Sequence, residues 1–351
     1  MIRRVQFTLK HANQSKITVL DGIFEESMRV VNLYIDKLWA GKNFSAKFVD
    51  FKVDTWLSAR LQQCLGKQAL EVVKSQRKRK KKTKPVFRRP TLNLDSRFVT
   101  VSFDINSFDT WITLSSLGKK IKLKLPSRKH KHYHTLCSNG YLLKKSCRLR
   151  CVDGKYYVDL YMEKPAPPLV KGGTAVGFDC GYKRLLVDSK GALHDVGLEP
   201  VYKKIARKRQ GSKAFKRSLT ERDNLINRTV NSIDLVGVKT VVVEDLKNVK
   251  KNSKGKRYKS FNNKLQRWSY PKVLDKLASV CEAAGIAFIK VAPAYTSQTC
   301  SQCGHVAKES RNGTSFCCVA CGYCIDADYN AAVNIRSLGV YSPHATLTVP
   351  Q

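Results

Sequence analysis

Hydrophobic side chains recur at helical spacing in two stretches near the N-terminus. In residues 20–38 the apolar positions fall along one face of a helix, and residues 53–74 show the same spacing. From residue 92 to residue 164 the pattern changes to alternating apolar and polar positions, as in "RFVTVSFD" and "CRLRCVDGKYYVDLYMEK", which is typical of strands. The N-terminal half is therefore expected to hold two helices and a small unit resembling a β-barrel.

The second half of the chain contains short apolar runs bounded by turn residues. The runs at 175–179 and 240–243 indicate buried strands, and residues 184–187 indicate a further strand after a glycine turn. Residues 267–285 are amphipathic at helical spacing, and residues 326–339 begin like a helix. Strands that alternate with helices predict an α/β domain, so the whole chain is expected to be a multidomain α/β protein.

The charge balance narrows the range of partners. The 351 residues carry 65 Lys plus Arg against 27 Asp plus Glu, a formal net charge of +38. Such an excess favours a polyanionic partner, and nucleic acid is the usual one. An anionic membrane surface is the alternative, but no amphipathic anchor or long apolar span is visible. Because the N-terminal residues also lack the apolar core of a signal peptide, we expect a cytoplasmic, nucleoid-associated protein with reduced cysteines.

Three segments have a bland and a functional interpretation. The charge run at 74–90 is either a solvated loop or lies on nucleic-acid phosphates, and we favour the second. Residues 247–264 are either a surface linker or a basic lid over the active site, and we again favour the second. His130, His132 and His134 are metal ligands or, as we expect, part of a polar strand face. The predicted nucleic-acid contacts are Lys78, Arg79, Lys80, Lys81, Lys82, Arg88 and Arg89.

Six of the twelve cysteines lie within residues 300–324. Four of them form two C-x-x-C pairs at the spacing of a tetrahedral zinc site, each followed by a glycine where the turn needs an unhindered backbone. The alternative, four buried free thiols, does not explain the paired spacing. Four protein ligands leave no open position for water, so the zinc is expected to be structural. The predicted ligands are Cys300, Cys303, Cys318 and Cys321, with Cys317, Cys324 and His305 as bystanders.

Acidic residues close two of the buried runs and open the last helix. Asp179 ends the first run, Glu244 and Asp245 follow the run of valines, and Asp326 and Asp328 open the helix. A carboxylate is costly to bury unless it is paired or binds a cation. A helix-capping role is the alternative for the last two acids, but three such places predict a carboxylate cluster. Two Mg²⁺ ions about 4 Å apart would relieve the repulsion and activate a water for phosphodiester cleavage.

Four motifs carry a resemblance to a known family. Together "GFDCGYKRLLVDSKG", "VVVEDL", "YTSQTCSQCG" and "FCCVACGYCIDADYNAAVNI" resemble, in order and spacing, the RuvC-like nuclease half of TnpB proteins, which insertion sequences encode. They are also similar to that half of the compact type V CRISPR effectors. The resemblance covers about residues 172–338. Phe178 stands where a smaller aliphatic residue is expected, Cys180 follows the first acid, and the chain is short for the family, but no ligand is missing.

The resemblance implies an RNase H-like fold and a function. The function is cleavage of target DNA beside a short adjacent motif, with a guide RNA as partner and two Mg²⁺ ions as cofactor. It assigns the catalytic, Mg²⁺-binding acids to Asp179, Glu244 and Asp328, with Asp326 as the rival for the third position. Because the cysteine cage stands just ahead of this third acid, the zinc would fix the loop that delivers it.

The resemblance also implies the domains, and it separates the competing functions. A catalytically silent RNA-guided repressor would lack one or more of the acids, and an unguided zinc-ribbon RNA-binding protein would leave them unexplained. A DNA-transposing enzyme is a fourth possibility, but the resemblance points to a nuclease. The implied domains are a wedge-like β-barrel (1–10 and 85–168), a helical recognition lobe (11–84), a RuvC-like domain (169–299 and 325–340), the zinc ribbon (300–324) and a tail (341–351).

Overall fold

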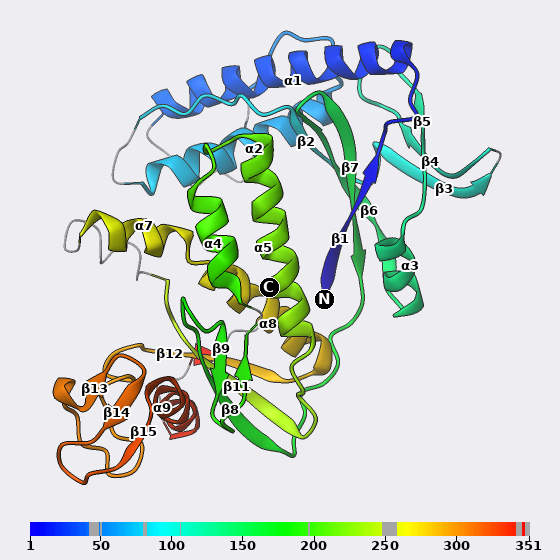
Figure 1. Ribbon diagram of the computed structural model, residues 1–351. Helices are drawn as coiled ribbons and strands as arrows, with labels where there is room; N and C mark the ends of the chain where they lie inside the picture. The colour runs from blue at the N-terminus through cyan, green and yellow to red at the C-terminus, as the bar shows by residue number, and fades with distance from the viewer. Residues whose placement is uncertain are drawn as a thin grey trace. The chain divides into compact units, whose positions relative to one another are not determined.

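The chain folds into two compact units, shown in the computed structural model of Figure 1. The first unit is Ile2–Pro165, and the second is Ala166–Gln351 together with Met1. Within the described residues, no helix has the length and apolar character needed to cross a membrane. The structure describes residues 1–41, 49, 51–79, 83–105, 107–195, 197–247, 258–341 and 346–347.

The first unit contains two antiparallel sheets. The N-terminal strand β1 pairs along its whole length with β7, from Ile2 opposite Glu163 to Thr8 opposite Tyr157. The alternating pattern after residue 92 is thus confirmed as strands. One sheet has the order β1 (Ile2–Thr8), β7 (Lys155–Glu163), β6 (Leu142–Val152), β2 (Thr91–Leu94), and the other β3 (Val99–Ile105), β4 (Phe108–Leu114), β5 (Leu123–Ser127).

Both predicted helices of this unit are confirmed. They are α1 (Gln14–Ala40) and α2 (Ala59–Arg77), which follow β1 and precede β2 in the sequence. The two helices pack against each other. The polar strand expected at residues 130–134 is wrong, because these residues lead into and form the short helix α3 (Lys131–Ser138). Tyr133 and Leu136 are three positions apart and form the buried side of this helix. The histidines at alternate positions gave the sequence a strand-like pattern instead.

The second unit is built on one mixed sheet. Strands β8, β11 and β12 run parallel, while β9, β10 and β16 are antiparallel to their neighbours. The buried runs predicted from the sequence are confirmed as β8, β9 and β11. The order across the sheet is β10 (Leu193–His194), β9 (Leu186–Asp188), β8 (Thr174–Asp179), β11 (Val238–Glu244), β12 (Ala287–Val291), β16 (Thr346–Leu347).

Helices cover both faces of this sheet. Successive side chains of a strand point to opposite faces, so Val241 and Val243 of β11 join the core under one group of helices, whereas Val242 joins a cluster with Ile335 of α9. The predicted amphipathic helix at 267–285 is confirmed as α8. The helices of this unit are α4 (Leu198–Ala206), α5 (Lys213–Asn231), α7 (Lys259–Arg267), α8 (Tyr270–Ala284) and α9 (Ala327–Tyr341).

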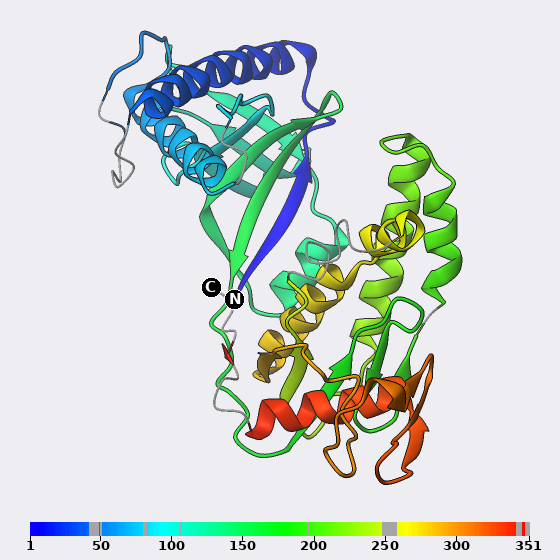
Figure 2. The same ribbon diagram turned by 90° about the vertical axis from the view of Figure 1, so that its left-hand side faces the viewer.

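A small three-stranded ribbon is inserted between β12 and α9 (Figure 2). Its core is Phe316, fully buried beside Cys300 and Cys318, and it includes Ala327, the first residue of α9. The ribbon is thus packed directly onto the start of the last helix. Its elements are a 3₁₀ turn (Lys308–Ser310), β13 (Arg311–Asn312), β14 (Ser315–Cys317) and β15 (Cys324–Asp326).

Candidate functional site

Three of the acids identified in the sequence line one cavity of about 630 Å³ in the second unit. Asp179 ends β8, Glu244 ends β11, and Asp328 lies in the first turn of α9. Because β8 and β11 are parallel and pair at Phe178 and Val243, the next residue of each strand emerges at the same edge of the sheet. Further residues that line the cavity are Arg184, Trp268, Thr296 and Arg311.

Two of these carboxyl groups, those of Asp179 and Glu244, have pKa values above those of isolated carboxyl groups. Burial raises the pKa of Asp179 to about 7, and the neighbouring carboxylates of Glu244 and Asp328 add to the rise. Burial also raises the pKa of Glu244, against the effects of a hydrogen bond donated by the Thr296 hydroxyl and of the Arg311 charge. Crowded acids with raised pKa values are frequent at functional sites. Their oxygens are the ligands that a hard cation such as Mg²⁺ prefers, so this set of donors fits such an ion.

The three acids lie less close together than the four cysteines of the ribbon. Among the described residues, the possible metal ligands whose atoms all lie within 4.8 Å of one another are the four cysteines, not the acids. Asp328 pairs with two guanidinium groups, its Oδ1 lying 3.0 Å from Arg311 Nη2 and its Oδ2 3.5 Å from Arg184 Nη1. The three carboxylates therefore do not converge on one point as closely as the four sulfur atoms do.

Asp326 has a different role from Asp328. Its Oδ1 accepts hydrogen bonds from the N–H groups of Asp328 and Tyr329, at 3.0 and 3.1 Å, so Asp326 caps the first turn of α9. Its Oδ2 lies 2.6 Å from Arg184 Nη1. Asp328 lines the cavity, while Asp326 is not among the residues that line it. The geometry favours Asp328 as the third member of the carboxylate cluster.

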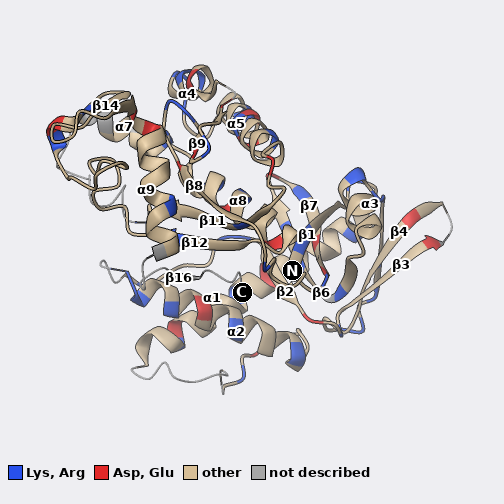
Figure 3. Ribbon diagram, turned by 90° about the horizontal axis from the view of Figure 1, so that it is seen from below, with Lys and Arg blue, Asp and Glu red and all other residues tan. Residues whose placement is uncertain are grey.

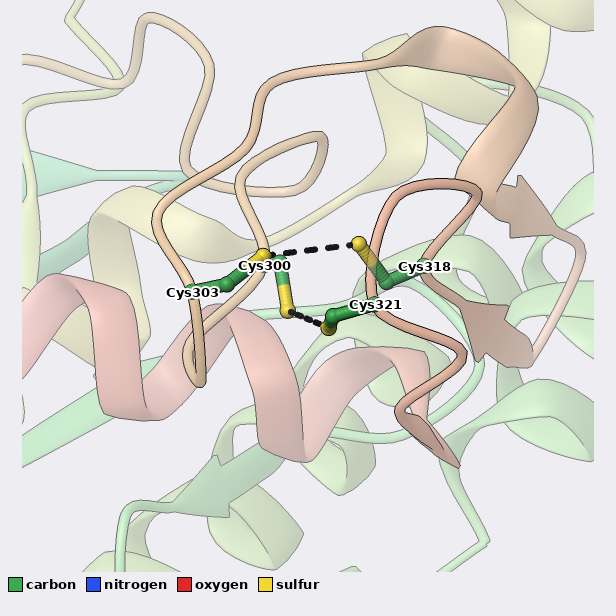
Figure 4. Close-up of side chains that lie close together, drawn as sticks. All are labelled: Cys300, Cys303, Cys318 and Cys321. Atoms are coloured by element: carbon green, nitrogen blue, oxygen red, sulfur yellow. Dashed lines mark hydrogen bonds between the residues drawn. The ribbon is translucent and has the colours of Figure 1, made fainter.

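The four predicted zinc ligands come together in the ribbon, as Figure 4 shows. Cys300 Sγ lies 3.8 Å from Cys321 Sγ, and Cys303 Sγ lies 3.6 Å from Cys318 Sγ. Zn–S bonds of about 2.3 Å in a regular tetrahedron require sulfur atoms about 3.8 Å apart. The sulfur positions therefore fit a tetrahedral zinc ion.

The two C-x-x-C segments adopt the same turn. The N–H of Gly304 donates to Cys300 O and the N–H of Gly322 donates to Cys318 O, each at 2.9 Å. Both glycines have left-handed backbone angles, with φ of +77° and +74°, which favour glycine over any residue with a side chain. Backbone hydrogen bonds, the strongest from Cys321, lower the pKa of the Cys318 thiol to about 6 and favour the thiolate that binds metal.

The remaining cysteines of the ribbon differ from the expectation. Cys317 and Cys324 are joined by a disulfide, so the expectation of reduced cysteines is wrong for this pair. Both residues lie outside the four-cysteine cluster, as expected of bystanders. The two residues face each other across the β14–β15 pairing, with Cα atoms 4.1 Å apart. His305 lies exposed in the first turn, where its carbonyl accepts from the N–H of Cys300 at 2.8 Å.

The predicted nucleic-acid contacts lie on the first unit. Lys78, Arg79, Arg88 and Arg89 are exposed there, while Lys80, Lys81 and Lys82 lie outside the described residues. Two further basic side chains of the same run contact other residues of the first unit. Arg77 Nη2 donates to Trp39 O at 2.7 Å, and Lys84 Nζ lies 2.9 Å from Asp36 Oδ1.

The predicted lid at residues 247–264 lies mostly outside the described residues, which omit 248–257. The described part continues into α7, and Leu265 and Trp268 at its end line the acid cavity. Trp268 Nε1 donates to Gly181 O at 2.9 Å, next to the strand that carries Asp179. The segment thus ends beside the acids, whereas the lid itself stays a prediction.

Two groups of residues escaped the sequence reasoning. The first is the pair of cations in the acid cavity, Arg184 and Arg311, which lie on a loop and on the ribbon hairpin without any spacing signal. The second is a basic stretch along α4 and α5, visible in blue in Figure 3. That stretch was readable in the sequence as a run without acids, and its exposed members are Lys203, Lys204, Arg207, Lys208, Arg209, Lys213, Lys216 and Arg217.

Comparison with known proteins identifies relatives of this chain. The family model for the Cas12f1-like TNB domain matches residues 270–335, which include the ribbon and the start of α9. A "CRISPR-associated endodeoxyribonuclease Cas12f1" of Sulfoacidibacillus thermotolerans is 44% identical over 100 residues, 28% of this chain and 22% of the relative. The "Putative RNA-guided DNA endonuclease InsQ" of Escherichia coli (strain K12) is 33% identical over 230 residues, 55% of each chain.

A solved structure extends the similarity beyond these segments. The protein in a cryo-EM structure titled as a Cas12f1–sgRNA–target DNA complex aligns with a TM-score of 0.58 and 17% identity, over 95% of this chain and 83% of that one. At this identity the likeness concerns the fold. Against the two curated relatives above, the matched segments span between about a fifth and just over half of the relative's length.

Proposed function

The chain is a TnpB-family relative of the type V effectors, and from this premise we propose that it is an RNA-guided DNA endonuclease. The observation that carries the proposal is the convergence of Asp179, Glu244 and Asp328, far apart in sequence, on one cavity. A net charge of +38 supports nucleic-acid partners, namely a guide RNA and a target DNA. The printed names of the relatives and of the solved complex support the same class of activity.

The second unit is proposed to be an RNase H-like, RuvC-type nuclease domain. The sheet supports this assignment because one part of it is antiparallel (β10, β9 and β8) and the adjoining part is parallel (β8, β11 and β12), with β8 shared by both. The ribbon is proposed to hold one structural zinc ion through Cys300, Cys303, Cys318 and Cys321. The first unit is proposed to combine the wedge-like β domain with the recognition lobe formed by α1 and α2.

In the proposed mechanism the chain's acids position two Mg²⁺ ions. When bound, the ions would activate a water and stabilise the leaving oxygen of a phosphodiester bond. Asp179, whose carboxyl group is close enough to feel the charges of both Glu244 and Asp328, would hold the ions together with these two acids. Arg311, which pairs with Asp328 and also acts on Glu244, would meet the negative scissile phosphate at the same cavity. Guide pairing, rather than these side chains, would select the sequence.

The test is guided cleavage by protein purified with its RNA. Sequencing of the co-purified RNA defines the guide, and a plasmid library with a matching target and randomised flanking bases reports cutting and the adjacent motif. We expect cutting in Mg²⁺ and none with Asp179→Ala, which should still bind the target. If the wild-type protein binds guide and target but leaves the DNA intact, the proposal of a nuclease is wrong and the repressor alternative replaces it. Absence of co-purified RNA would instead favour an unguided binding protein.

A further inference from the structure

Two asparagines on α9 hold the segment that leads from β12 into the ribbon. Asn330 and Asn334 are one helical turn apart, 0% and 8% exposed. Asn330 Nδ2 donates to Thr299 O at 2.8 Å, and its Oδ1 accepts from the N–H of Ser301 at 2.9 Å. Asn334 Nδ2 donates to the carbonyls of Thr296 and Thr299, at 2.9 and 2.7 Å. The helix that carries Asp328 is thereby joined by hydrogen bonds to residues 296–301.

Packing alone does not account for these amides. Their neighbours on α9, Ala331, Ala332 and Ile335, are apolar and at most 1% exposed. An apolar side chain would fill the same space without the cost of burying an amide, so the asparagines are explained by the carbonyls and the N–H group that they bind. Ser301 stands between the first two cysteines of the cluster, so these bonds also reach the first C-x-x-C turn.

The held segment ends in a side chain that touches the acid cluster. Thr296 is 3% exposed, and its hydroxyl donates a hydrogen bond to Glu244 Oε1. The preceding residue, Tyr295, has φ of +63°, and its side chain is 64% exposed. A left-handed conformation of this kind is strained for a bulky residue. The strained turn at Tyr295 directs the next hydroxyl inward, onto the carboxylate.

We propose that Thr296, Asn330 and Asn334 are positioning residues that fix the Glu244 carboxylate relative to Asp328 and connect both to the first turn of the cysteine cluster. The inference rests on the proposed function, because it assigns the Glu244 carboxylate to a cation. The Thr296 hydroxyl occupies one lone pair of Oε1, so it sets the direction in which the remaining lone pairs face the cavity. Partners of metal-binding carboxylates typically contribute about 10–100-fold to metal affinity.

The experiment measures binding of Mn²⁺ alone, followed by the electron paramagnetic resonance signal of the free ion, in zinc-loaded protein without DNA. Asp179→Asn defines the loss of the site. We expect Thr296→Val to weaken Mn²⁺ binding about 10-fold or more, because the carboxylate is no longer held. Thr296→Ser keeps the hydroxyl and should therefore avoid this loss and bind Mn²⁺ much more tightly than Thr296→Val. Thr229→Val, which removes an equally buried hydroxyl that bonds Leu225 O in α5, is the matched control and should bind like the wild type.

A second variant separates positioning from folding. Asn334→Ala should also weaken Mn²⁺ binding while the zinc content stays at one per chain and the unfolding transition stays cooperative. Mn²⁺ affinity unchanged in both Thr296→Val and Asn334→Ala would overturn the inference, as would a loss in Thr296→Ser equal to that in Thr296→Val. Failure of the proposed function gives a different result. In that case wild-type protein binds Mn²⁺ and the variants lose it, yet guided DNA is not cut.

Discussion

The crowding of carboxylates predicts that removing one negative charge stabilises the protein when no Mg²⁺ is present. In Asp179→Asn the amide keeps nearly the same shape but carries no charge. The pKa of Asp179 is raised from 3.8 to about 7, first by burial and then by the Glu244 and Asp328 carboxylates. A shift of one pKa unit corresponds to about 1.36 kcal/mol, so the ionised form costs at most about 4 kcal/mol of stability. Because the side chain faces a solvent-accessible cavity, screening reduces this limit, and we expect about 1–3 kcal/mol.

The sign of the effect fixes its dependence on pH. The folded-state pKa lies above the unfolded value, so between about pH 4 and pH 7 the folded protein binds more protons than the unfolded chain. Wild-type stability is therefore lost as the pH rises through this window, and the penalty is complete above about pH 7. The gain from Asp179→Asn should accordingly be full at pH 8 and nearly absent at pH 4.5.

The assay is thermal or urea unfolding of zinc-loaded protein without added Mg²⁺ and without chelator, since a chelator would also strip the cysteine cluster. A gain of about 2 kcal/mol raises the melting temperature by roughly 4–8 °C in a unit of this size. Asp275→Asn, at an exposed position on α8, is the control and should change little. Added Mg²⁺ should stabilise the wild type and narrow the difference. A gain of equal size at pH 4.5 and pH 8, or no gain at pH 8, would refute the reasoning.

Three further predictions follow from the same site and surfaces. Asp328→Ala should abolish guided cleavage. Asp326→Ala should still cleave DNA but lose about 0.5–2 kcal/mol of unfolding free energy, because the helix cap is missing. If Asp326→Ala abolished cleavage and Asp328→Ala did not, the two roles would be exchanged. Cys318→Ser should lower zinc from one ion per chain and destabilise the ribbon, measured by metal analysis and unfolding, whereas retained zinc would contradict the ligand set. Neutralising Lys78 and Arg79 should flatten the slope of log affinity for nucleic acid against log salt by about 1.4–1.8, without moving the cut site.

The regular part of the fold was predictable because periodicity reports local burial. The valines of β11 and the apolar face of α8 follow from their spacing alone, and so does the pairing of the two C-x-x-C segments. The short helix at 131–138 was not predictable, because alternating histidines mimic a strand while only two buried side chains decide the matter. The roles of the three acids stay predictions, although the structure brings these residues to one cavity.

The contacts that complete the site depend on tertiary structure, which no local pattern encodes. Arg311 reaches Asp328 only because the ribbon folds back over the start of α9. Cys317 and Cys324 meet through strand register rather than through a recognisable spacing. In the sequence, Asn330 and Asn334 look like ordinary polar residues of a helix. Their role becomes visible only once their partners at residues 296–301 are known.

The four-cysteine cluster comes directly before residues 326–332 ("DADYNAA"), which open α9. This order in the sequence has a geometric explanation. A side chain added at Gly177 in β8 would lie 2.3 Å from Ala332 O, and one at Gly339 would lie 2.5 Å from Val242 Cγ1 and Cγ2, so these two glycines let α9 rest directly on the sheet. Contact of this kind fixes the distance of α9 from the sheet. The ribbon adds a second attachment near the start of the helix, because its core includes Ala327 and the N–H of Ser301 in its first turn donates to Asn330. The ribbon, which a zinc ion would brace, therefore helps to set where the first turn of α9, and Asp328 with it, meets the strand ends that carry Asp179 and Glu244.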